Sequence, residues 1–188
     1  MAVYLIRHGE TEWSRTHRHT GRTDLPLTAE GEGQGIRLGQ RLAGLEFDRV
    51  LTSPRLRARR TAELAGFPAA EVSPLLAEFD YGDYEGLSRA EIERARPGWD
   101  LWRHGCPGGE SPAQVEARAR KALAELGSST ERNYLLVTHG HMLRALAAVY
   151  LGSSLELCDH LIVAVASISV LAREHGLTAI AAWNLTWE

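Results

Sequence analysis

Short apolar segments alternate with segments of helical period along most of this chain, and charged or small polar residues follow several of the apolar segments directly. The first apolar segment, Val3–Ile6, stops at Arg7-His8-Gly9. Strands that alternate with helices form a mainly parallel sheet covered by helices on both faces. The pattern therefore predicts a three-layer α/β/α fold with a mainly parallel central sheet.

Six stretches have the apolar or β-branched composition of strands and are bounded by turn residues. They are Val3–Ile6, Arg49–Thr52, Val72–Leu75, Tyr134–Thr138, a strand near Ile162–Leu171, and Leu177–Trp183. The polar segment Glu10–Leu27 between the first two is expected to be irregular.

Capping residues mark the helices that we expect between the strands. Thr28 is expected to cap a helix that reaches Leu45, although its four glycines weaken the helical pattern. Four other helices are expected. The first starts at Ser53-Pro54 and ends near Ala65, and a short second one starts at Ser88, with Glu91 completing a capping box. The third runs from Ser111, again with capping-box spacing to Gln114, to Leu126, and the fourth spans about Met142–Leu151.

No repeat, low-complexity tract or linker divides the 188 residues, so we expect one domain over residues 1–188. No apolar run reaches the ~18–20 residues that span a bilayer, and no basic segment precedes a long apolar stretch at the N-terminus. The two cysteines, Cys106 and Cys158, need no disulfide framework. These features predict a cytoplasmic protein without a membrane partner.

The net charge of −3 disfavours a general nucleic-acid binder, but the charge is unevenly distributed. Residues 1–60 hold 11 arginines against 7 acidic residues, and only Lys121 among the 21 basic residues is a lysine. Genome composition explains such a bias, and so does an anion site in the first third of the chain, because arginine matches phosphate with a planar set of donors.

Three groups of polar residues follow the first, second and fourth expected strands. They are Arg7-His8-Gly9, Ser53–Arg60 and His139-Gly140. A lone Arg-His pair is more often a cap and a satisfied core histidine than a site. In a parallel sheet, however, all three groups reach one rim, where ligands bind. Two arginines and two histidines around one point would form a site for a tetrahedral anion.

Several motifs share the order they have in a known family: Leu5–Thr11 (LIRHGET), Thr20–Thr28, Ser53–Ala62, Glu78–Gly86 and Thr138–His141. Together they resemble the histidine phosphatase superfamily, also called phosphoglycerate-mutase-like. The resemblance spans residues 4 to about 146. It implies the phosphoglycerate-mutase-like α/β/α fold and phosphoryl transfer.

The resemblance also implies roles for single residues. His8 corresponds to a nucleophile that forms a phosphohistidine, and Arg7, Arg57 and His139 correspond to a clamp on the phosphoryl oxygens. Glu78 corresponds to the proton donor, a role that requires a raised pKa, so we expect it to be partly buried. The same loop offers Asp80, Asp83 and Glu85 as alternatives. Substrate contacts are expected from Ser14, Thr20, Gly21, Tyr81, Gly140 and His141.

Metal or nucleotide binding has weaker support in the sequence. His17-x-His19 and His139-x-His141 have spacings compatible with metal pairs, yet no Cys or acidic partner joins the first pair, so a solvated loop is the simpler interpretation of it. The glycines at 31, 33 and 35 follow no strand and precede no P-loop lysine. We therefore expect neither a metal nor another cofactor.

Phosphoglycerate mutases of the family carry Asn where this chain has Ser14, and they carry a basic segment that this chain lacks. The chain is more similar to the sedoheptulose-1,7-bisphosphatase and acid phosphatase branch, including the segment Trp102–Glu110, although it lacks the insertions of the fungal enzymes. We therefore expect a metal-independent phosphomonoesterase that acts on a small phosphorylated metabolite, such as a sugar phosphate or bisphosphate. The alternatives are a cofactor-dependent phosphoglycerate mutase and a catalytically silent phospho-ligand binding module.

Two segments have two explanations each. Trp99–Glu110 could cover the pocket or only pack its two tryptophans. The apolar stretch Leu161–Leu171 fits either an edge strand in a homodimer interface or a buried strand.

Overall fold

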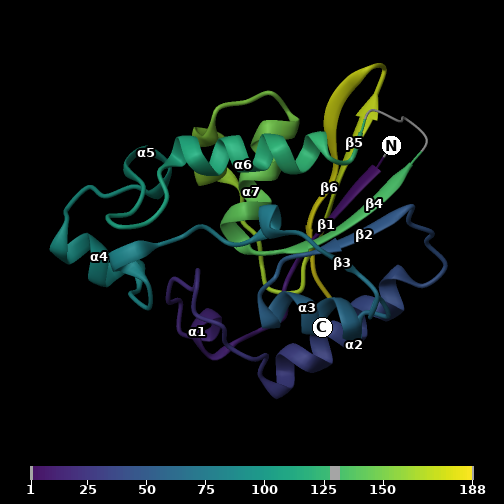
Figure 1. The fold of residues 1–188 in the computed structure, drawn as a ribbon, viewed down its shortest axis with the longest axis horizontal. Coiled ribbons are helices and arrows are strands. Elements are labelled where there is room, and N and C mark those ends of the chain that lie inside the picture. Colours follow the sequence, from purple (N-terminus) through teal and green to yellow (C-terminus); the bar gives the residue numbers. More distant parts are fainter. Residues whose placement is uncertain (1, 128–131, 188) are drawn as a thin grey trace.

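The computed structural model describes residues 2–127 and 132–187. A six-stranded sheet with the order β3-β2-β4-β1-β5-β6 forms its centre (Figure 1). The strands are β1 (Ala2–Arg7), β2 (Arg49–Thr52), β3 (Glu71–Val72), β4 (Asn133–Thr138), β5 (Ile168–Glu174) and β6 (Leu177–Leu185). The expected three-layer α/β/α architecture is confirmed.

The first four strands are parallel to one another, and β5 and β6 are antiparallel additions beside β1. In the register of the parallel strands, Arg7 lies opposite Thr138, and Thr52 lies opposite Val137. The carboxyl ends of β1, β2 and β4 are therefore level. This alignment brings the residues that follow them to one rim, as the sequence predicts.

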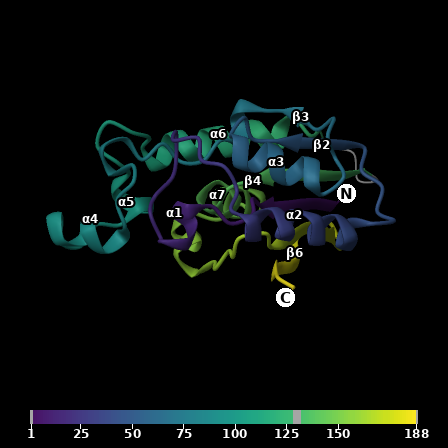
Figure 2. The same cartoon turned by 90° about the horizontal axis from the view of Figure 1, so that it is seen from below.

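Helices cover both faces of the sheet, because successive strand residues point to opposite sides. Val3 and Leu5 belong to the core beneath α6 (Pro112–Ala124) and α7 (Gly140–Tyr150). Ile6 belongs to the core beneath α2 (Ala29–Leu42) and α3 (Leu56–Leu64). Figures 1 and 2 show these two helix pairs on opposite sides of the sheet.

The helix predicted after Thr28 forms despite its glycines. The Thr28 hydroxyl accepts the Gly31 N–H, which caps the first turn. A Cβ on Gly31 would lie 2.1 Å from the Glu10 carbonyl oxygen, and a Cβ on Gly9 would lie 2.5 Å from the Gly31 oxygen. Glycine at these positions lets α2 approach the segment after β1 closely enough to pack on it.

The prediction that Ser53 caps the second helix is wrong. Helix α3 begins at Leu56, and the Asp24 carboxylate, 32 residues away in sequence, accepts the Leu56 N–H. The Ser53 hydroxyl instead lies 2.7 Å from Nε2 of His139. A cap that comes from a distant loop leaves no local signal in the sequence.

Two predicted strands are shorter than expected. β3 ends at Val72, because Pro74 has no N–H for pairing and begins the 3₁₀ helix Pro74–Leu76. β5 begins only at Ile168, since the Val163 carbonyl binds Arg7 instead of a neighbouring strand, and Ala166 turns the chain with φ 52°. β5 pairs with β1 on one side and with β6 on the other. Of the two explanations for Leu161–Leu171, the buried strand is therefore the correct one, and the edge strand is not.

Small elements surround the rim of the sheet. They are α1 (Glu12–Arg15), α4 (Arg89–Ala95), α5 (Leu101–His104) and the 3₁₀ helices Gly82–Tyr84 and Leu155–His160. Figure 1 shows α1, α4 and α5 beyond the carboxyl ends of the parallel strands, away from the N-terminus. Every helix within residues 2–127 and 132–187 is too short or too polar to traverse a membrane.

Candidate active site

A pocket of about 330 Å³ opens at the carboxyl ends of the parallel strands. Its wall combines the segment after β1, the loop before Tyr81 and the first turns of α4 and α7. The lining residues are Arg7, His8, Ser14, His17, Arg18, His19, Thr20, Glu78, Tyr81, Arg89, Gly140, His141 and Arg144. The pocket is thus rich in cationic and imidazole side chains.

His8 is buried at the pocket, and its hydrogen bonds determine its tautomer. Nδ1 lies 2.7 Å from the Gly9 carbonyl oxygen, which can only accept, so Nδ1 carries the proton. Nε2 accepts a hydrogen bond from Nε of Arg57 at 3.3 Å. Burial, and then the charges of Arg57 and Arg7, lower the pKa of His8 well below its usual value. The ring is therefore neutral, with a lone pair on Nε2.

Arg57 is fully buried and is held by the loop after α1. Its guanidinium donates to the carbonyl oxygens of Thr20 at 2.7 Å and Thr23 at 3.0 Å. The N–H groups of Gly21 and Thr23 in turn donate to the carboxylate of Glu85. The loop thus lies between the Glu85 carboxylate and the Arg57 guanidinium, and its hydrogen bonds to both hold the guanidinium beside His8.

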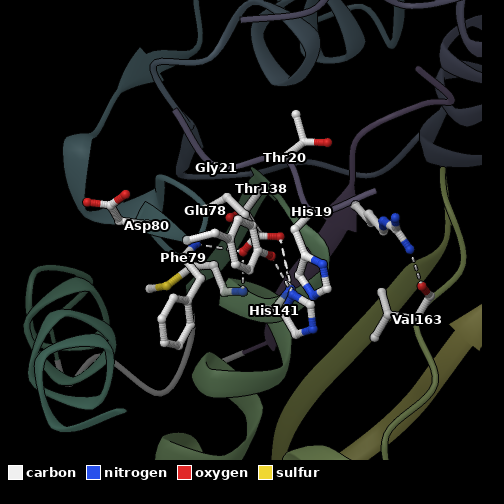
Figure 3. A network of polar contacts seen from close by, with 12 residues as sticks. His19, Thr20, Gly21, Glu78, Phe79, Asp80, Thr138, His141 and Val163 are labelled. Carbon is white, nitrogen blue, oxygen red and sulfur yellow. Dashed lines mark hydrogen bonds and ion pairs between the residues drawn. The ribbon is translucent and has the colours of Figure 1, made fainter. Parts of the chain in front are cut away.

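Arg7 and His139 complete the group of two arginines and two histidines predicted from the sequence. Arg7 donates to the Val163 carbonyl at 2.6 Å (Figure 3). The His139 ring lies 5.0 Å from the His8 ring, centroid to centroid. Burial, followed by the nearby Arg57 charge, lowers the pKa of His139 well below its usual value. Nε of Arg7 and Nδ1 of His139 are buried without a hydrogen-bond partner in the described residues.

The Glu78 carboxylate lies at the N-terminus of α7, where free N–H groups point toward it. It accepts hydrogen bonds from Phe79, His141 and Met142, the last at 2.9 Å (Figure 3). Glu78 is 8% exposed, which satisfies the expected burial. Arg118 donates to the carbonyls of Ala77 and Glu78 and so holds this segment from below.

His141 connects Glu78 to an aromatic wall. Its Nδ1 lies 2.5 Å from the Tyr81 hydroxyl and 3.9 Å from the Glu78 carboxylate. Burial raises the pKa of Tyr81 and lowers that of His141, so the hydroxyl donates to a neutral ring. His19 stacks parallel to His141 at 6.0 Å, and Trp99 and Trp102 pack beside the two imidazoles.

The described part of the chain holds no group of three or more His, Cys, Asp or Glu side chains placed to bind a metal ion. His19 is half-buried in the pocket wall and binds the Leu87 carbonyl at 2.8 Å. The solvated loop expected for His17 and His19 is therefore wrong for His19.

The sequence model of the histidine phosphatase superfamily (branch 1) matches residues 3–186. The chain belongs to this superfamily.

Two relatives and one solved structure show which histidine phosphatases the chain resembles. An acid phosphatase of Mycobacterium tuberculosis is 45% identical over 187 residues, which cover 98% of this chain and 92% of the relative. The sedoheptulose 1,7-bisphosphatase of Saccharomyces cerevisiae is 36% identical and matches 81% of this chain and 68% of the relative. The solved structure of an open reading frame product of M. tuberculosis has a TM-score of 0.94 at 44% identity, covering 98% and 97% of the two chains.

The remaining expected contact residues of this histidine phosphatase are not all at the pocket surface. Ser14, Thr20 and Gly140 line it, but the Ser14 hydroxyl also forms the capping box of α1 with Thr11. Gly21 lies outside the lining and binds Arg57 and Glu85 through its backbone.

Five further residues line the pocket that were not predicted as contacts from the sequence, namely His17, Arg18, His19, Arg89 and Arg144. One signal was present. Arg144 follows His141 by three residues, and this spacing puts both on one face once a helix starts at Gly140 rather than at Met142.

Proposed function

We propose that the protein is a metal-independent phosphomonoesterase that hydrolyses a small phosphorylated metabolite through a phosphohistidine on His8. The observation that carries this proposal is the hydrogen bonding of the His8 ring, in which Nδ1 lies against the Gly9 carbonyl and Nε2 accepts from Arg57. The acid phosphatase among its relatives supports phosphomonoester hydrolysis, and the sedoheptulose 1,7-bisphosphatase supports a sugar phosphate as substrate. We also propose that the chain is one histidine phosphatase domain, in line with the match to residues 3–186.

In the first step, the Nε2 lone pair attacks phosphorus and the P–O bond to the leaving group breaks. Arg57 Nε then donates to a phosphoryl oxygen instead of to the ring nitrogen. The unpartnered Nε of Arg7 and Nδ1 of His139 are available for the other phosphoryl oxygens. These fixed donors stabilise the charge of the transition state, a task that Mg²⁺ performs in other phosphoryl-transfer sites.

Glu78 is the proposed proton donor and acceptor. Its carboxylic acid protonates the leaving oxygen in the first step. In the second step, its carboxylate takes a proton from the attacking water while the P–N bond breaks and phosphate leaves, which restores the acid. The N–H groups of Phe79, His141 and Met142 hold the carboxyl group in one orientation.

Trapping of a labelled phosphoryl group tests this proposal. Rapid acid-free quenching of the protein with a ³²P-labelled phosphomonoester is expected to label His8, and His8→Ala is expected to lose both label and turnover. Activity that persists unchanged in excess EDTA is expected as well. Equal labelling of His8→Ala, or isomerisation of phosphoglycerate stimulated by 2,3-bisphosphoglycerate at a rate above hydrolysis, would contradict the proposal.

A further inference from the structure

The connection that leads into β5, residues 162–167, lies against Arg7 and His8. The Ala166 N–H donates to the His8 carbonyl at 3.1 Å. The guanidinium of Arg7 donates from Nη1 to the Val163 carbonyl at 2.6 Å (Figure 3). This connecting segment therefore binds both the backbone of the proposed nucleophile and a side chain of the proposed clamp.

Two side chains of β6 bind the connecting segment on either side of Val163. The indole Nε1–H of Trp183 donates to the Ile162 carbonyl at 2.7 Å. The Ala164 N–H donates to Oδ1 of Asn184, also at 2.7 Å. Val163 itself is buried, so the two bonds fix the peptide groups on both sides of an enclosed residue.

The backbone of β6 is irregular where it makes these contacts. One residue of β5, Ser169, lies opposite two residues of β6, Trp183 and Asn184, which is the pattern of a β-bulge. Asn184 has φ 53°, and its N–H donates to the Ser169 hydroxyl at 3.0 Å. Ala166 in the connecting segment has φ 52°, a conformation that residues with a Cβ rarely adopt. Backbone strain of this kind persists where the surrounding structure determines it, and it is frequent at functional sites.

The orientation of the Arg7 guanidinium depends on the Val163 carbonyl, because the guanidinium is planar and rigid. The hydrogen bond from Nη1 sets the direction of the plane, and with it the directions of the other N–H groups. Nε of Arg7 is buried without a hydrogen-bond partner in the described residues, and it is one of the donors that we propose for the phosphoryl oxygens. A shift of the Val163 carbonyl would therefore turn this donor away from the phosphoryl group.

We propose that Trp183 and Asn184 are positioning residues for phosphoryl transfer, which orient the Arg7 guanidinium through the Val163 carbonyl. This inference rests on the proposed phosphatase function and adds two residues to it. Both residues lie outside the pocket lining, so they act through Arg7 and not on the substrate. Their effect belongs to the transition state, because a donor displaced by about 1 Å stabilises the developing charge far less.

Asn184→Gly removes the side-chain acceptor and keeps the backbone, since glycine adopts a φ near 53° freely. The rate of phosphohistidine formation, measured by rapid quench with a ³²P-labelled phosphomonoester, is expected to fall about tenfold. Asn184→Asp is expected to keep about half of the wild-type rate or more, because its carboxylate still accepts and aspartate tolerates this φ. Trp183→Phe removes the N–H donor but keeps an aromatic ring, and a fall of about two- to tenfold is expected.

A double-mutant cycle with Arg7 separates positioning from a general effect on the fold. Arg7→Met alone is expected to slow phosphohistidine formation about 100- to 1000-fold. In the Arg7→Met protein, Asn184→Gly is expected to slow it further by less than about twofold, because the group that Asn184 positions is already absent. His175→Gly is the matched control, since it also replaces a residue with positive φ, at the exposed turn between β5 and β6, and it is expected to keep the wild-type rate.

The inference is overturned if Asn184→Gly and Trp183→Phe, shown to be folded by urea unfolding, form phosphohistidine at the wild-type rate. It is overturned as well if Asn184→Gly lowers the rate by the same factor with and without Arg7, or if Asn184→Asp is as slow as Asn184→Gly. A wild-type protein that forms no phosphohistidine is a different result, which contradicts the phosphatase function on which the inference rests.

Discussion

At the scale of single residues, the chemistry of the site depends on neighbours that hold His8 in one protonation state. The sequence was sufficient to bring Arg7, His8, Arg57 and His139 together, because each lies at the carboxyl end of a parallel strand or in the segment after it. It could not predict the tautomer of His8, which is set by the Gly9 carbonyl and by the Arg57 N–H. These bonds depend on backbone angles and on a contact between residues 49 positions apart.

The lowered pKa of His8 predicts activity at acidic pH. An imidazole with an ordinary pKa near 6.5 would be about 90% protonated at pH 5.5 and unable to attack phosphorus. Because burial and the Arg57 charge keep His8 neutral, the rate of phosphohistidine formation is expected to fall less than twofold between pH 7 and pH 5.5. Rapid-quench measurements across this range test the prediction, and a tenfold fall would contradict it.

Glu85 is predicted to position Arg57 through the loop that lies between them. Glu85→Ala removes the acceptor for the Gly21 and Thr23 N–H groups, so the carbonyls that hold Arg57 are free to move. We expect kcat to fall about 10- to 100-fold while the phosphohistidine still forms on His8. Glu85→Gln is expected to restore part of the rate, because its amide oxygen still accepts.

The control for this prediction is Asp83→Ala, which removes an exposed carboxylate from the same loop. It is expected to keep the wild-type kcat. The idea fails if Glu85→Ala retains full kcat, or if Glu85→Gln is as slow as Glu85→Ala while both unfold at the wild-type temperature.

At the scale of helices and strands, local signals predicted the elements and distant contacts decided their ends. Thr28, Ser88 and Ser111 cap helices as expected, because each cap bonds to an N–H three residues later. Helix α3 starts later than predicted, because Asp24 caps it from another loop. The early start of α7 at Gly140 is also invisible locally, since the distant Glu78 binds its first free N–H groups.

Substitution by alanine is expected to have opposite effects on stability at two glycines of α2, Gly31 and Gly33. Gly31→Ala puts a Cβ against the Glu10 backbone and is expected to lower the free energy of unfolding by about 1–3 kcal/mol. Gly33→Ala meets only the flexible tip of Arg37 at 3.4 Å and is expected to raise it by about 0.5–1 kcal/mol, the difference in helix propensity. Urea unfolding measures both values, and equal effects would show that the close approach at Gly31 is unimportant.

At the scale of the whole molecule, the sheet brings several arginine side chains to one pocket at its rim, where they are not enclosed in the apolar core. The protein has a net charge of −3, yet four arginines line its pocket. The arginine excess of residues 1–60 was the only feature of the composition that pointed to such a site. Parallel topology explains why the polar residues after the expected strands were enough to locate this site. The positions of Arg89 and Arg144 in it depend on how α4 and α7 sit against the rim, which no local pattern specifies.

The same burial makes the stability of the fold depend on pH. Four histidines have pKa values lowered mainly by burial, namely His8, His19, His139 and His141. As pH falls below about 6.5, the unfolded chain takes up protons that the folded protein does not bind, so folding becomes less favourable. Above about pH 7.5 both states are neutral at these rings, and the effect is absent.

We therefore expect urea unfolding to give a lower free energy at pH 5.5 than at pH 7.5. Each fully buried neutral histidine contributes a loss of about 1.4 kcal/mol at pH 5.5. His141→Gln, whose amide can still accept from Tyr81, is expected to reduce the difference between the two pH values by up to that amount. The exposed His160→Gln is the control and is expected to leave the difference unchanged. Equal unfolding free energies at pH 5.5 and 7.5 would mean that the buried rings take up protons in the folded state, and the neutral nucleophile proposed for His8 would lose its basis.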